Sequence, residues 1–165
     1  MKGRWAAGIA PRNFAWILKD QMAISERPGG YARSHRPVRR QEEIIWIREQ
    51  HFSRVVSILV SPHNLHAYDE LGVAWVHLPL HADDGGEYLT DLYTRLRGWL
   101  VAGDKVLLHQ EEMGDSLQGV VAGYLVWAGL ITEPAQAIAV VETINQRQIG
   151  PAGRELVAVA HALVR

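Results

Sequence analysis

Two short segments of the chain are almost entirely apolar, and they restrict the fold more than any other feature. They are Val55–Val60 (VVSILV) and Lys105–His109 (KVLLH). Apolar runs of this length are typical of central strands that are covered on both faces of a sheet. Three further strand candidates are Ala15–Lys19, Met22–Ser25 and Ala74–Pro79. The pattern predicts a sheet whose central strands run parallel.

Helical patterns alternate with these strand candidates. The expected helices span Val38–His51, Gly86–Ala102, Asp115–Gly129, a segment from Pro134 to about Asn145, and Pro151–Val164. Thr132 is expected to cap the fourth of them, with Pro134 in its first turn. The alternation predicts an α/β fold with a mainly parallel sheet flanked by helices. Ligand sites in such folds lie at the carboxyl ends of the strands, here His77–Gly86 and His109–Leu117.

Composition removes several classes of function. The 165 residues fit one domain, and a formal net charge of −1 gives no field for binding nucleic acid or a membrane surface. The chain has no cysteine, which excludes disulfides, zinc–thiolate sites and thiol chemistry. It shows neither a signal peptide nor a transmembrane run, so the expected location is cytoplasmic.

One segment resembles a known signature. VLLHQEEMGDSLQGVVAGYLVWAGL, from Val106 to Leu130, is similar to the loop and helix of dual-specificity and tyrosine phosphatases: V-L-V-H-C, five residues, an arginine, then Ser or Thr. AWILKDQMAISERPGG, WVHLPLHADD and AQAIAVVETINQRQIGPAGREL look like neighbouring parts of the same family. The resemblance implies a three-layer phosphotyrosine-phosphatase-like domain over residues 14–165, preceded by an extension over residues 1–13.

The resemblance fails where the family's chemistry resides. Gln110 stands at the position of the nucleophilic cysteine and Ser116 at that of the phosphate-binding arginine. Met113 replaces a glycine of the loop, and Leu117 replaces the hydroxyl residue. A glutamine amide is not a nucleophile, so no catalysis is expected from this loop. The loop positions concerned are His109, Gln110, Glu111, Glu112, Met113, Gly114, Asp115 and Ser116, with Asp83 and Asp84 as vestigial candidates for the general acid.

The charges of the loop argue against phosphate as a ligand. Glu111, Glu112 and Asp115 are acidic in a segment that would have to receive a dianion. Two unit charges about 4 Å apart repel by about 4 kcal/mol at an effective dielectric constant near 20, whereas a helix N-terminus contributes about 0.3–1 kcal/mol of attraction. Phosphate binding is therefore not expected, and the sequence implies no cofactor.

Other roles for the same residues stay open. His81, Asp83, His109 and Glu111 offer oxygen and imidazole ligands for a divalent cation, although their spacing matches no metal motif. The alternative is that the carboxylates are solvated groups at helix N-termini, with Asp84 as a cap, and that His109 is a buried support of the loop.

Two function classes follow. The first is a catalytically inactive domain that binds a protein partner or a second copy of itself, with the basic residues Arg27, Arg33, Arg36, Arg39 and Arg40 as a docking candidate. The second is a hydrolase with a rebuilt, metal-dependent site of histidine and carboxylate residues.

Overall fold

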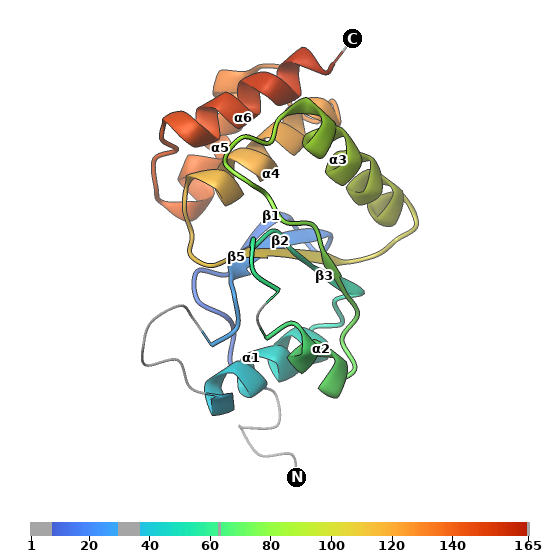
Figure 1. The fold of residues 1–165 in the computed structure, drawn as a ribbon. Coiled ribbons are helices and arrows are strands. Elements are labelled where there is room, and N and C mark those ends of the chain that lie inside the picture. The colour runs from blue at the N-terminus through green and yellow to red at the C-terminus, as the bar shows by residue number, and fades with distance from the viewer. Residues whose placement is uncertain (1–7, 30–36, 63, 165) are drawn as a thin grey trace.

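A five-stranded sheet organises the computed structural model of the chain, which describes residues 8–29, 37–62 and 64–164 (Figure 1). The strand order is β1-β2-β5-β3-β4. β1 pairs with β2 antiparallel, and the other three pairs are parallel. The prediction of a mainly parallel sheet flanked by helices is confirmed.

The elements follow the predicted alternation. In chain order they are β1 (Ala15–Leu18), β2 (Met22–Glu26), α1 (Pro37–Glu49), β3 (Arg54–Ser57), α2 (His66–Glu70), β4 (Trp75–His77), α3 (Gly86–Val101), β5 (Val106–Gln110), α4 (Asp115–Trp127), α5 (Pro134–Asn145) and α6 (Pro151–Ala162). No described helix is both long and apolar enough to cross a membrane.

Helices cover both faces of the sheet, which gives three layers (Figure 1). α1 and α2 lie on one face and α3 to α6 on the other. Alternation along β5 separates the two cores, because Val106 and Leu108 pack with the larger helical layer and Leu107 packs with the smaller one. The sheet is therefore buried on both sides, as its apolar runs predict.

Local details depart from the sequence expectations. β3 ends at Ser57, although the apolar run continues to Val60. Ile58 and Leu59 are apolar because they remain buried in the core after the strand has ended. α2 has five residues, too few for a periodic pattern, and it was not predicted. The predicted cap Thr132 is wrong: Glu133 occupies that position and makes no side-chain capping bond.

Residues 8–13 lie against the domain. The Ile9 N–H donates to the Glu42 carbonyl at 3.2 Å, and the Glu26 N–H donates to the Arg12 carbonyl at 3.0 Å. Pro11 is buried. This part of the predicted extension therefore packs on α1 and β2.

α4 and α6 approach each other closely at two glycines. A methyl group on Gly119 would lie 2.6 Å from the Cα atom of Gly153, a distance at which backbone atoms would have to move. Glycine at both positions permits this approach. The contact holds the first turn of α6 beside the first turn of α4, where the candidate site lies.

Candidate functional site

His109 is the only loop position that keeps the residue type of the resembled signature, and it lies inside the protein. Its side chain is 2% exposed, and its Nδ1 atom lies 3.0 Å from the hydroxyl of Tyr68. Burial lowers the pKa of His109 to about 3, and the positive charges of Arg27 and His77 act in the same direction. The neutral, enclosed imidazole therefore supports the end of β5 and is not accessible to a metal ion or substrate in the solvent.

Gln110 ends β5 and uses its own side chain to hold the start of the loop. Its Oε1 atom accepts a hydrogen bond from the backbone N–H of Glu111 at 2.9 Å. Its carbonyl accepts from the Arg27 N–H at 2.8 Å, which ties the loop to the end of β2. The N–H of Glu111, which stands one residue after the nucleophile position, is therefore already bonded within the chain.

The acidic residues of the loop do not form one cluster. Glu111 is exposed and lies 3.4 Å from Arg27, and Asp115 accepts from the Gly150 N–H at 2.8 Å through its Oδ1 atom. Glu112 is exposed to solvent. The expectation of three jointly repelling charges is therefore too simple, because two of these carboxylates have partners that the sequence did not indicate.

Met113 gives the loop an apolar anchor. Its side chain is 3% exposed and belongs to the core between the sheet and α3 to α6. Its carbonyl accepts a hydrogen bond from Nη1 of Arg147 at 3.0 Å. The loop is thus held from inside by a buried side chain and from outside by an arginine.

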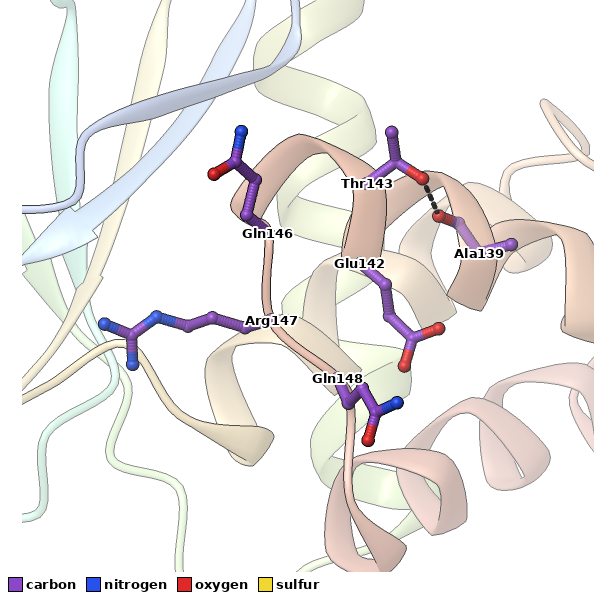
Figure 2. Close-up of a pocket in the computed structure, with 6 residues that line it drawn as sticks. All are labelled: Ala139, Glu142, Thr143, Gln146, Arg147 and Gln148. Carbon is purple, nitrogen blue, oxygen red and sulfur yellow. Dashed lines mark hydrogen bonds between the residues drawn. The ribbon is translucent and has the colours of Figure 1, made fainter.

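Arg147 belongs to the connection between α5 and α6. Figure 2 shows a shallow pocket at this end of α5, where Thr143 donates to the Ala139 carbonyl and Arg147 extends away from Glu142 and Thr143. Glu142 accepts from the Ile149 N–H at 2.7 Å. The polar groups of this pocket therefore hold the turn between the two helices.

The larger hollow at this end of the sheet is a cleft of about 600 Å³ between residues 80–85 and the first turns of α4 and α6. It contains four of the predicted site residues: His81, Asp83, Asp84 and Ser116. Asp84 does not cap α3 as expected. The capping position is occupied by Gly85, so no side chain caps this helix. Instead, Asp84 accepts from the His81 N–H at 2.6 Å and lies 3.4 Å from that imidazole.

The four metal candidates do not come together. His81 and Asp83 line the cleft, whereas His109 is buried against Tyr68 from α2 and Glu111 faces Arg27. Among residues 8–29, 37–62 and 64–164, no group of three or more histidine and carboxylate side chains could hold a metal ion. The predicted candidates therefore do not form a metal site within this part of the chain.

Comparisons with solved structures decide the fold. Tk-PTP in its active form superimposes with a TM-score of 0.74 at 16% identity, covering 92% of this chain and 98% of that one. A kinase-associated phosphatase whose catalytic-site cysteine is replaced by serine gives 0.73 at 18%, covering 88% and 91%. A variant of human DUSP28 gives 0.63 at 14%, covering 93% and 96%.

The chain has the dual-specificity and tyrosine phosphatase fold. No family model and no curated protein matches the sequence. The structural likeness spans nearly the whole chain, so the implied three-layer fold is confirmed. The absence of any cysteine from this phosphatase-like chain is consistent with a degenerate signature loop.

Three residues of the site were not found by sequence reasoning. Glu155 lines the cleft from α6, Arg147 bonds the loop at Met113, and Tyr68 pairs with His109. Glu155 is an exposed charge on α6 and Arg147 an exposed charge in the α5–α6 connection, and such surface charges carry no sequence signal of their own. Tyr68 belongs to the short helix that periodicity could not show.

Of the basic docking residues, Arg33 and Arg36 lie outside the described residues, and Arg39 donates to Glu43 at 2.7 Å.

Proposed function

We propose that this chain is a catalytically inactive phosphatase-like domain that acts as a protein-binding or regulatory module. The observation that carries the proposal is Gln110 at the end of β5, at the position of the missing nucleophile. Its amide oxygen accepts the Glu111 N–H at 2.9 Å, so the side chain has a structural task in the loop. An amide engaged in this way neither attacks phosphorus nor acquires a negative charge.

The surroundings of Gln110 support the same conclusion. An arginine at the position of Ser116 would grip two phosphate oxygens in a fork, and a serine hydroxyl offers one donor without charge. The side chain of Met113 is buried where the resembled signature has a glycine. The loop has thus gained anchors for its own conformation and lacks the groups that recognise a dianion.

A binding role accounts for what the domain retains. The sheet, the loop and the helix after it are kept in an ordered arrangement although the loop's nucleophile and arginine are absent. Folds of this kind carry many functions, and function depends on the site that the fold presents. We therefore assign the role to a surface that a protein partner recognises.

The alternative is a hydrolase with a rebuilt metal site. The one observation in its favour is the pair of His81 and Asp84, 3.4 Å apart in the cleft that also contains Ser116. Zinc-dependent hydrolases hold their metal with three protein ligands, and the described residues supply no third one here. The inactive binding domain is therefore the better-supported proposal.

An assay of aryl phosphate turnover tests the proposal. Purified protein should release no more phosphate from p-nitrophenyl phosphate than buffer does, with and without added manganese. Vanadate should leave the melting temperature unchanged, because the loop lacks the arginine that holds a tetrahedral oxyanion.

The matched control is Gln110→Ala, which removes the only polar group at the nucleophile position. Any background turnover that this variant shares with the wild type comes from a contaminant. Turnover that vanadate inhibits, and that Gln110→Ala or Ser116→Ala abolishes, would show that the loop is catalytic and would refute the proposal.

A further inference from the structure

The cleft beside α6 differs in charge from the former signature loop. Asp83 and Asp84 contribute to it from the loop before α3, and Glu155 contributes from α6. Among the described residues, no lysine or arginine lines it. The cleft is therefore a local negative surface on a chain whose formal net charge is only −1.

Two of its carboxylates are available to a partner. Asp83 and Glu155 are exposed, and no lysine, arginine or histidine of the described residues lies within ion-pair distance of either. The carboxylates of the former loop differ, because Glu111 already has Arg27 and Asp115 already has the Gly150 N–H. Glu112 is the one loop carboxylate that is exposed without an ion pair or hydrogen bond among the described residues, whereas the cleft brings two such carboxylates, Asp83 and Glu155, to one hollow.

The third carboxylate fixes the shape of the rim. Asp84 accepts from the His81 N–H at 2.6 Å, which closes the turn that carries Asp83. Gly85 then caps α3, whose first residue, Gly86, lies near the side chain of Leu163 at the end of α6. The rim residues therefore sit on a turn braced by its own hydrogen bond.

The wall of the cleft is apolar. Leu80 and Leu156 are each 8% exposed, and Val159 is partly buried beside them. A volume of about 600 Å³ falls within the range of about 300–1,000 Å³ that is usual for ligand pockets. A ligand that matches this cleft has a cationic end for the carboxylates and an aliphatic portion for the leucine and valine side chains.

Arginine has both features. Its guanidinium group binds carboxylates through parallel hydrogen bonds, and its methylene stem packs along apolar surface. We propose that this cleft binds an arginine-containing peptide segment of a protein partner, with an apolar residue next to the arginine. The inference deepens the proposed function and rests on it, since it names the surface and the chemistry of the partner.

The test uses the full chain and a short labelled peptide with the sequence Leu-Arg-Leu-Arg-Gly, followed by fluorescence polarisation. Asp83→Asn with Glu155→Gln removes both available carboxylates. The charge-matched control is Glu112→Gln with Glu133→Gln, two exposed carboxylates outside the cleft. Ala152→Trp fills the cleft from an exposed position without changing charge. The melting temperature of each variant is measured as a check on folding.

The cleft double variant should weaken peptide binding about tenfold, because each exposed ion pair contributes up to about fivefold in affinity. Ala152→Trp should weaken it at least as much. The control variant should change it by less than about twofold, and raising the salt concentration should reduce only the wild-type and control affinities appreciably.

Three results would overturn the inference. They are equal affinity for the cleft and control variants, equal affinity for a peptide with glutamine in place of arginine, and tighter binding of spermine than of the peptide, which would indicate a site for small cations. None of them bears on catalysis. Phosphate turnover is measured separately, so a failure of the proposed function and a failure of the cleft assignment remain distinguishable.

Discussion

Replacing Met113 tests whether the degenerate loop has become part of the core. Its side chain is 3% exposed and packs between the sheet and the larger helical layer. Truncating a buried methionine to alanine typically costs about 2–5 kcal/mol, because the transfer free energy is lost and a cavity remains. We expect Met113→Ala to lower the free energy of unfolding by that amount, a large part of the 5–15 kcal/mol that is usual for a domain.

Guanidinium denaturation followed by tryptophan fluorescence measures this loss, since the chain contains six tryptophans. Met113→Leu is the matched control, because a swap that conserves volume usually costs less than about 1.5 kcal/mol. Glu112→Ala tests the neighbouring exposed position, where a change within about 0.5 kcal/mol is expected.

A cost below about 0.5 kcal/mol for Met113→Ala would refute the reasoning, because the side chain would then behave as a surface residue. The expected result has a consequence for restoring activity. The resembled signature has a glycine at this position, so a variant that restores it together with Gln110→Cys and Ser116→Arg would have to tolerate the loss of a core side chain. The proposed inactivity would in that case rest on stability as well as on chemistry.

Much of the fold could be predicted from local sequence. The apolar runs at β3 and β5 identify strands covered on both faces, the almost entirely apolar sequence of α4 identifies a buried helix, and the one apolar face of α3 identifies a helix that packs on the core. These signals are local, because a buried strand or helix needs apolar side chains along its own sequence. Element ends were less predictable, since Ile58 and Leu59 remain apolar for the core beyond the end of β3.

The candidate site was predictable in position and only partly in arrangement. The strand ends indicated where site residues would gather, and Asp83, Asp84 and Ser116 do share one cleft. The partners of the loop carboxylates could not be read from spacing, because Arg27 follows the end of β2 and Gly150 precedes α6, both far from the loop in sequence. Such pairs depend on how helices and strands pack.

The burial of individual side chains was beyond the sequence as well. Met113 and Glu155 lie in segments whose local pattern fits either exposure or contact, and only packing assigns one to the core and the other to the cleft. That assignment changes the electrostatic picture. In the loop, Glu111 lies beside Arg27 and Asp115 accepts from the Gly150 N–H, whereas Asp83 and Glu155 in the cleft are exposed and have no ion-pair partner among the described residues.

Two further predictions concern groups that hold the site. Asp115→Ala should lower the free energy of unfolding by about 1 kcal/mol, as loss of a helix cap does, and Asp115→Asn should cost less because its oxygen can still accept from the Gly150 N–H; equal costs for the two variants would contradict this role. The second prediction concerns acid stability. His109 stays neutral in the folded protein down to its pKa of about 3, whereas in the unfolded chain it takes up a proton near pH 6.5. Its contribution to stability is therefore complete above pH 6.5 and is lost as the pH falls towards 3, by about 1.4 kcal/mol for each pH unit. His109→Asn keeps a polar group for the Tyr68 hydroxyl and does not titrate, and the other histidines are common to both proteins. Between pH 6.5 and 5, the wild type should lose about 2 kcal/mol more than the variant in denaturant unfolding. Parallel losses would mean that His109 is accessible to protons in the folded protein, and the enclosed pairing with Tyr68 would then be an incorrect description of this end of β5.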